Sequence, residues 1–159
     1  MLNNHENYLD QFTSAFKKNI MVMTGLTCEL SEPRPQSITF ASSGLAVIIG
    51  VTGTRPGIII LDTSREIARS LCELIDGEEY SLEDEFVLYT IAEFANVVSG
   101  HAISLISDLY VGLHLDITPP SIFSGEKLKI TSPKIKPEVI EATTLIGKIY
   151  ITLGLEKSI

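Results

Sequence analysis

Apolar residues recur every three or four positions at the start of the chain, which predicts an amphipathic helix. The helix is expected over about residues 4–23, and Gly25 is placed to end it. Its apolar stripe consists of Tyr8, Phe12, Phe16, Ile20 and Met23. Residues 31–35 follow, and their two prolines exclude a continuing helix. We therefore expect a linker after the first helix.

Two Val- and Ile-rich runs come next and predict a β-hairpin. The strands are expected over residues 44–53 and 57–61, with a turn at 54–57. The glycine series Gly50, Gly53 and Gly57 has some likeness to a phosphate-binding loop. However, no Lys-Ser/Thr pair ends the series, and a strand rather than a helix follows it. The hairpin is the better interpretation.

A second helix is predicted after the hairpin. Thr63 and Glu66 have the spacing of a capping box, in which a hydroxyl precedes a carboxylate by three residues. The helix should end at residues 76–77, an Asp-Gly pair. Its expected buried face is made of Ile67, Leu71, Leu74 and Ile75.

A third, longer helix follows an acidic connection at residues 78–80. Ser81 and Asp84 form another hydroxyl-and-acid start, and the helical pattern continues to about Leu109. At 1.5 Å per residue the helix should be roughly 40 Å long.

Beyond Gly112 the pattern changes to strands, expected over residues 113–117, 121–131 and 148–155. Residues 118–120, Thr-Pro-Pro, form a rigid break, and the sequence leaves open whether a cis bond occurs there. The segment order predicts an α+β fold: a mostly antiparallel sheet with helices packed on it. A length of 159 residues suits one domain, which we assign to residues 1–159.

The long helix has two different faces on a helical wheel. The face expected to pack on the sheet carries Leu88, Ile91, Ala95, Val98, Ala102, Leu105 and Ile106. The opposite face carries Tyr89, Glu93, Asn96, Gly100, Ser104 and Ser107.

That outer face is unusual because no Lys or Arg occurs between Leu82 and Leu109. A glycine inside a helix costs about 1 kcal/mol relative to alanine, so Gly100 indicates that something approaches the backbone closely. Glu93 and Asn96, at positions i and i+3, are therefore the candidate functional residues of a docking surface. The alternative is a solvated pair on a helix that simply lacks basic residues.

Residues 93–100, EFANVVSG, resemble the Glu-x-x-Asn-x-x-x-Gly signature of the CheC/CheX/FliY family of chemotaxis phosphatases. The hairpin, the Asp-Gly-Glu turn at residues 76–78 and the Pro-Pro break at 119–120 resemble the CheX branch. The resemblance extends over about residues 6–156. It implies a CheX-like α+β fold in which the long helix carries the Glu-x-x-Asn motif.

The resemblance also implies an activity, a protein phosphatase for the phosphorylated response regulator CheY. Water attacking an aspartyl phosphate must lie in line with the leaving oxygen, and a side-chain amide can both accept from and donate to that water. Asn96 would position the water, and Glu93 would pair with a lysine of the regulator. Tyr89, Gly100 and Ser104 are expected to contact the partner.

The same resemblance sets expectations for cofactors and assembly. The Mg²⁺ ion would belong to the regulator, so no cofactor and no metal site are expected on this chain. CheX members are homodimers joined through their sheets, and a homodimer is expected here. Members with two sites repeat the signature on the first helix. In this chain no Asn follows Glu6 by three residues, so we expect one active site per chain.

Two other classes of function remain open. One is a non-catalytic module that binds or scaffolds a response regulator in a two-component or flagellar switch system. The other is a structural dimerisation domain in which the motif is incidental. The intact Glu93 and Asn96 pair favours catalysis, because a protein that only binds does not need a water-positioning amide.

Charge and composition exclude several partners. The formal net charge of −8 argues against nucleic acid and against an anionic membrane surface. A loose basic patch is interpreted as a solvated strand face; it contains Lys127, Lys129, Lys134 and Lys136. The longest apolar run, residues 45–51, is far short of the ~20 residues of a membrane span.

The remaining polar and sulfur-containing residues give no competing site. Cys28 and Cys72 have no metal or redox spacing and are expected to pack as small apolar side chains. The histidines are too far apart for a metal site, although His101 lies at the border of the docking face. The first residues do not have the pattern of a signal peptide, and a cytoplasmic location is expected.

Overall fold

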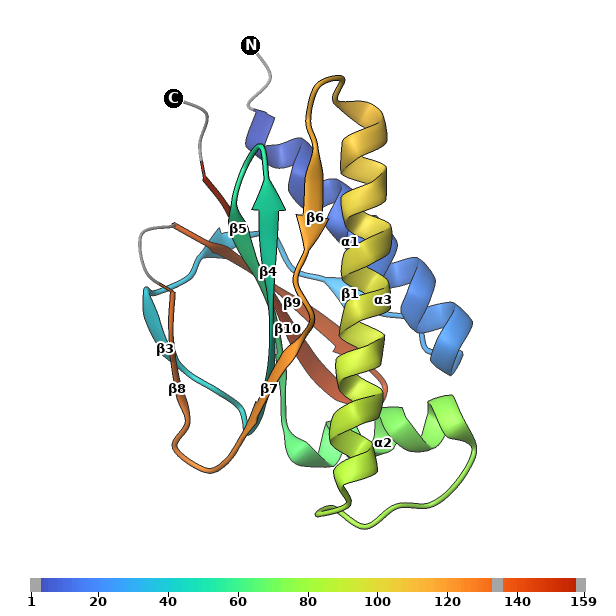
Figure 1. Ribbon diagram of the computed structural model, residues 1–159. Helices are drawn as coiled ribbons and strands as arrows, with labels where there is room; N and C mark the ends of the chain where they lie inside the picture. Colours follow the sequence, from blue (N-terminus) through green and yellow to red (C-terminus); the bar gives the residue numbers. More distant parts are fainter. Residues whose placement is uncertain (1–3, 133–135, 157–159) are drawn as a thin grey trace.

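The computed structural model describes residues 4–132 and 136–156, and Figure 1 shows their arrangement. Its helices are α1 (Asn4–Thr24), α2 (Arg65–Asp76) and α3 (Glu85–Leu109). The first strands are β1 (Glu29–Leu30), β2 (Arg34–Pro35), β3 (Thr39–Ala41), β4 (Leu45–Gly53) and β5 (Gly57–Thr63). The later strands are β6 (Leu115–Ile117), β7 (Ser121–Ser124), β8 (Lys129–Thr131), β9 (Glu138–Thr144) and β10 (Gly147–Leu155).

The strands form one large antiparallel sheet and one small one. In the large sheet the order is β1-β9-β10-β5-β4-β6, with β2 also pairing with β9 and β7 also pairing with β4. Strands β3 and β8 form a separate antiparallel pair. The predicted α+β fold, with a mostly antiparallel sheet and one long helix, is confirmed.

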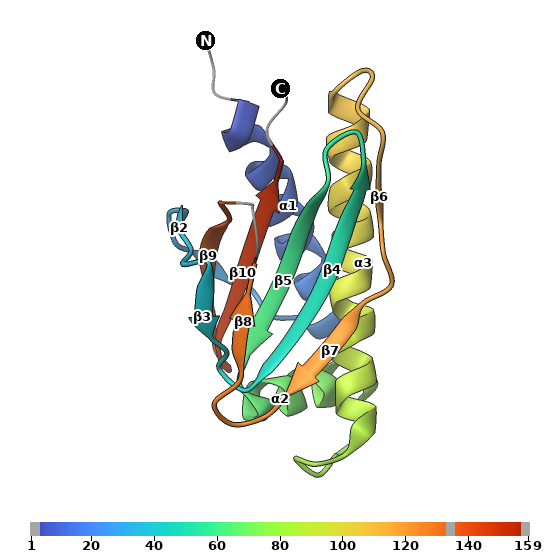
Figure 2. The same cartoon turned by 60° about the vertical axis from the view of Figure 1, so that its left-hand side comes forward.

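The two faces of the large sheet are covered differently, as the two views show (Figures 1 and 2). Helices α1 and α3 pack on one face, where they share the main core with strands β4, β5, β9 and β10. The β3–β8 pair covers part of the other face, where Ala46, Ile60 and Ile130 form a smaller apolar cluster. We call this second face the outer face.

The first helix forms as its apolar spacing predicts. Tyr8, Phe12, Phe16 and Ile20 are all buried, whereas Met23 is only partly buried at the helix end. Gly25 follows the helix with a φ of 78°, and its N–H bonds to a carbonyl of the last turn.

The predicted hairpin is also present, formed by β4 and β5. Gly53 ends β4 with a φ of 106°, and a Cβ atom there would lie 2.1 Å from the His114 carbonyl oxygen. Only glycine fits that close approach of two backbones.

Both predicted helix caps were misplaced. The cap of α2 is Ser64, whose Oγ accepts from the Ile67 N–H at 3.2 Å. Thr63 still belongs to β5, and its hydroxyl donates to the Lys148 carbonyl. For α3 the cap is Asp84, whose carboxylate accepts from the Phe86 N–H at 2.9 Å, and not Ser81.

Leu74 was also assigned wrongly. It is 45% exposed and so lies outside the buried face of α2, whereas Leu71 is fully buried. Gly77 ends the helix as predicted, in the left-handed conformation with a φ of 80°. Cys72 is buried and Cys28 half-buried, and both are free thiols, in line with the predicted packing role.

The C-terminal half differs more from the prediction. The strand expected over residues 121–131 is two strands, β7 and β8, separated by a turn in which Lys127 has a φ of 59°. Strand β9 was not predicted at all, and it lies between β10 and the short edge strands β1 and β2. The expected linker at residues 31–35 therefore contains β2, although its prolines do exclude a helix.

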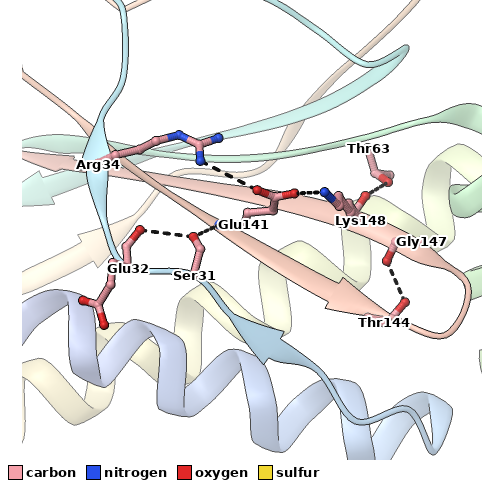
Figure 3. Close-up of polar contacts among 8 residues, drawn as sticks. All are labelled: Ser31, Glu32, Arg34, Thr63, Glu141, Thr144, Gly147 and Lys148. Carbon is pink, nitrogen blue, oxygen red and sulfur yellow. Dashed lines mark hydrogen bonds and ion pairs between the residues drawn. The ribbon is translucent and has the colours of Figure 1, made fainter.

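A group of polar contacts fastens this linker to β9 (Figure 3). The Ser31 hydroxyl accepts from the Glu141 N–H at 2.9 Å. The Glu141 carboxylate contacts Lys148 at 2.5 Å and Arg34 at 3.7 Å. The adjacent ammonium of Lys148 is the main reason why the pKa of Glu141 is lowered. Hydrogen bonds and an ion pair thus hold this segment against β9, in addition to the packing of Leu30 on the core.

The outer face also contains a buried carboxylate, Asp62 of β5. It is 4% exposed, one oxygen accepts from the Ser43 N–H at 2.8 Å, and the other oxygen has no hydrogen-bond partner. Burial raises the pKa of Asp62 above its usual range. The folded state therefore favours the protonated carboxyl group, and ionisation of Asp62 lowers stability at pH values above that raised pKa.

Replacing Asp62 with asparagine should stabilise the protein at neutral pH. The Asp62→Asn side chain keeps an acceptor for the Ser43 N–H but carries no charge. We expect the unfolding temperature to rise at pH 7, by roughly 2–4 °C per kcal/mol for a chain of this size. The gain should shrink as the pH falls towards 4, because wild-type Asp62 then becomes protonated. Thermal unfolding of both proteins across this range, with the exposed Asp10→Asn variant as control, is the measurement. An equal gain at both pH values would contradict the assignment.

Candidate functional site

Helix α3 carries the candidate site, and its rotation is fixed by what it packs against. It contacts α1, α2 and strands β4, β6 and β7. Phe94 meets Phe16 of α1 edge-on, with ring centroids 6.0 Å apart. The buried residues of the helix are Val87, Ile91, Phe94, Ala95, Val98, Ser99, Ala102, Ile103 and Ile106.

This buried arc is wider than the predicted one. Leu88 and Leu105, expected on the buried face, are only partly buried, whereas Phe94 and Ile103 are buried although they were not expected to be. Helix α1 covers a second side of α3 in addition to the side that packs on the sheet, so residues on both sides are buried. The opposite, solvent-facing direction is as predicted.

The predicted site residues share that solvent-facing side. Glu93 and Ser104 are exposed, Tyr89 is 68% exposed, and Asn96 and Gly100 are half-buried. We call these five residues the ridge. Within the described residues, neither the Glu93 nor the Asn96 side chain forms a hydrogen bond or an ion pair. Both side chains are therefore available to a visiting molecule.

Gly100 is not required by the packing of this protein. A Cβ atom at this position would lie 3.9 Å from Ile117 Cδ1, an ordinary van der Waals distance, and would meet no other atom within 4 Å. The glycine thus lowers helix stability without relieving an internal clash. This observation favours an external reason for its presence, namely a partner that approaches the backbone.

His101 is turned towards α1. Its Nδ1 atom lies 2.9 Å from Asn19 Nδ2, which also donates to the Ala15 carbonyl. Because an amide NH₂ group only donates, Nδ1 is the acceptor, and a neutral His101 carries its proton on Nε2. His101 therefore links α3 to α1, whereas the sequence placed it at the border of the docking face.

The ridge lines none of the described surface cavities. Two surface cavities, of about 340 and 250 Å³, lie near Arg65 and Asp62 respectively, and no residue of α3 lines either of them. Within the described residues, no group of three or more His, Cys, Asp or Glu side chains is arranged to hold a metal ion. The ridge itself has a single carboxylate, Glu93.

By length and composition alone, α3 would be able to cross a membrane. The sequence prediction of no membrane span rests on the longest uninterrupted apolar run, residues 45–51, and α3 has no such run because polar residues such as Glu93 and Asn96 interrupt it. Its most apolar 18-residue window is 44% buried inside the fold. Packing against α1 and the sheet accounts for that apolar composition, as it does for core helices in general.

The basic patch and the proline break complete the predicted features. Lys127, Lys129 and Lys136 are exposed, in line with a solvated face, whereas Lys134 lies outside the described residues. The peptide bonds before Pro119 and Pro120 are trans.

Comparison with known proteins assigns the chain to a class and then to a family. The family model "Chemotaxis phosphatase CheX" matches residues 45–143, more than half of the chain, and this range includes Glu93 and Asn96. The CheY-P phosphatase CheX of Thermotoga maritima is 33% identical over 116 residues, which cover 72% of this chain and 74% of the relative.

Solved structures agree with this match. A CheX protein from Desulfovibrio desulfuricans superposes with a TM-score of 0.84 at 19% identity, covering 94% of this chain and 99% of the other. CheX in a CheX–CheY–BeF₃–Mg²⁺ complex from Borrelia burgdorferi superposes with a TM-score of 0.83 at 26% identity, covering 94% and 98%. The chain belongs to the CheX family of chemotaxis phosphatases. The predicted family and its CheX branch are confirmed.

Proposed function

We propose that this protein hydrolyses the aspartyl phosphate of a CheY-type response regulator, with Asn96 positioning the attacking water. The observation that carries the proposal is the ridge: an unpaired amide and an unpaired carboxylate one turn apart on a rigid helix. The matched T. maritima relative is named a CheY-P phosphatase, and the B. burgdorferi CheX was crystallised with CheY.

The main requirement for the phosphatase is to position the attacking water. Water oxygen forms a bond to phosphorus, the bond from phosphorus to the aspartate oxygen breaks, and the carboxylate leaves with its electron pair. Both protons of the water end on the released inorganic phosphate, so no general base is needed to remove them. A carboxylate is a good leaving group, so no general acid is needed to protonate it. Asn96 Oδ1 accepts a hydrogen bond from the water and holds it in line, which converts a random encounter into an oriented one.

Glu93 has a different task in this mechanism. Its exposed carboxylate lies one helical turn before Asn96, so a lysine of the regulator that pairs with Glu93 fixes where Asn96 enters. The charge neutralisation that Mg²⁺ supplies to a phosphoryl group would come from the regulator, because Glu93 is the only carboxylate on the ridge. Tyr89, Gly100 and Ser104 form the surrounding contact surface.

Asn96→Ala should abolish most of the hydrolysis without weakening binding. A lost positioning contact costs roughly 100-fold in rate, so phosphate release at saturating regulator should fall by about that factor. The concentration of regulator at half-maximal rate should stay within twofold. The measurement is phosphate loss from a phosphorylated CheY-type regulator. Gln11→Ala, which removes a half-buried amide on α1, is the matched control.

The result also separates catalysis from binding alone. Equal rates for the intact protein and Asn96→Ala would reject the catalytic role of Asn96. Binding of the phosphorylated regulator with no acceleration by the intact protein would leave only the non-catalytic binding or scaffold module.

Glu93→Ala should act mainly on affinity. Loss of the proposed ion pair removes the docking charge, so the half-saturating regulator concentration should rise about tenfold, while the saturating rate changes little. The difference between Glu93→Ala and the intact protein should shrink at high salt, because salt screens the pair. Glu126→Ala removes an exposed glutamate far along the chain and serves as control. If the half-saturating regulator concentration of Glu93→Ala equals that of the intact protein, Glu93 does not contribute to docking.

We also propose that the protein forms a homodimer through its sheet, as its resemblance to CheX proteins implies. Large apolar side chains lie in solvent on and beside the strands, among them Phe123 of β7, which is 44% exposed, and Ile38 just before β3, which is 58% exposed. A cytoplasmic location remains a prediction.

Light scattering tests the dimer. The expected mass is twice the chain mass of 17.4 kDa at micromolar concentration, and Phe123→Asp should shift it towards the single-chain value. A single-chain mass at every concentration would contradict the proposal. An unchanged dimer in Phe123→Asp would place the interface away from β7.

A further inference from the structure

Two exposed aromatic residues precede the Glu93 and Asn96 pair on the same side of α3. Phe86 lies seven residues before Glu93, and Tyr89 lies seven residues before Asn96. Seven residues are close to two full turns, so each aromatic residue lies on the same side as its counterpart, about 10 Å away along the helix. Phe86 is 45% and Tyr89 68% exposed.

Phe86 is held in place although it is exposed. Its ring stacks on Tyr80, with centroids 5.2 Å apart and planes at 24°. Tyr80 is in turn fixed by Glu73, which accepts from its N–H at 3.0 Å, and by Asp76, which accepts from its hydroxyl. We call Tyr80, Phe86 and Tyr89 the aromatic platform. A contact that is already ordered loses little conformational entropy when a partner binds.

A response regulator seated on Asn96 is large enough to contact the aromatic platform as well. A specific protein interface buries about 800 Å² on each side, far more than Glu93 and Asn96 can supply. A folded domain of about 100 residues has a radius of gyration of about 13 Å, so its surface extends beyond that distance from its centre. Phe86 is ten residues before Asn96, about 15 Å along the helix. A regulator seated on Asn96 therefore also reaches Phe86.

The two directions along α3 differ in what they offer such a partner. Towards the C-terminal end, Gly100 and Ser104 are small and permit close approach but supply little contact area. Towards the N-terminal end, the platform supplies the large, rigid aromatic groups in which binding energy concentrates. Glu78, Glu79, Glu83 and Glu85 are exposed in the same region, and no ion pair involves them within the described residues.

We infer that the aromatic platform is a second contact surface through which this protein binds its response regulator. The regulator that fits carries an apolar side chain flanked by basic ones, about 10–15 Å from its phosphorylated aspartate. The apolar side chain packs on Phe86 and Tyr89, and the basic ones face the glutamates. This inference rests on the proposed function, because it takes the regulator as the occupant of the ridge.

Hydrolysis of a phosphorylated CheY-type regulator, measured over a range of regulator concentrations, tests the inference. Phe86→Ala should raise the half-saturating concentration about tenfold or more and leave the saturating rate within twofold. Phe86→Tyr keeps the ring and should restore the half-saturating concentration. Leu109→Ala is the control, since Leu109 is a 58% exposed apolar residue of the same helix outside the platform.

The outcomes separate this inference from the proposed function. If the intact protein neither binds nor hydrolyses any CheY-type regulator, the proposed function fails. If the intact protein is active and Asn96→Ala is not, but Phe86→Ala has the half-saturation of the intact protein, only the platform is rejected. A fall in saturating rate with unchanged half-saturation also rejects it. Phe86→Leu, which keeps an apolar side chain at the helix start, replaces Phe86→Ala if the latter unfolds at a lower temperature.

Discussion

The rotation of α3 about its own axis is the constraint on which the rest of the molecule depends. Phe94, Ala95 and Val98 are buried between α1 and the sheet, and this burial leaves the helix one orientation. Turning the helix by one residue, about 100°, would in one direction bring Glu93 to the buried position of Phe94, and in the other direction bring Phe94 to the exposed position of Glu93. Burying an unpaired carboxylate and exposing an aromatic ring are both costly, so the core itself aims Glu93 and Asn96 outwards.

Charged residues are distributed unevenly between the ridge and the start of α3. The net charge is −8, yet the ridge has one carboxylate and α3 has no basic residue. Acidic residues gather instead at the end of α2 and in the connection to α3, where Glu73 and Asp76 bind Tyr80 and Asp84 caps α3. Several of these acids therefore have structural roles in ordering the start of α3, and the remaining glutamates stay in solvent.

The parts of the structure that follow from local spacing were predictable from the sequence, and those set by long-range pairing were not. The stripe from Tyr8 to Ile20 and the outward side of α3 are periodic signals of single helices, and both are present. Strand β9 forms a tight hairpin with β10, but it was missed because Glu138 and Glu141 interrupt its apolar pattern and its other partner, residues 29–35, lies more than a hundred positions earlier. Thr63 was taken as a cap because the sequence does not show that β5 still pairs there with Leu45. The exposure of Phe86 could likewise not be predicted from the sequence, because an aromatic residue in the first turn of an apolar helix would ordinarily be placed in the core.

An exposed ridge suits a protein whose partner already holds the reacting group. A phosphatase that acts on a small molecule needs a cavity to surround it, whereas a phosphoryl group on another protein lies in that protein's own site. The useful feature is then a side chain on a support that cannot bend away. Helix α3 provides the support: Asp84 fixes its first turn, Phe94 packs on Phe16, and His101 bonds to Asn19 of α1. None of these contacts involves the Glu93 or Asn96 side chain. The position of Asn96 is therefore set by the packing of α3, and in the proposed mechanism the exposed side chains of the ridge are left to contact the regulator.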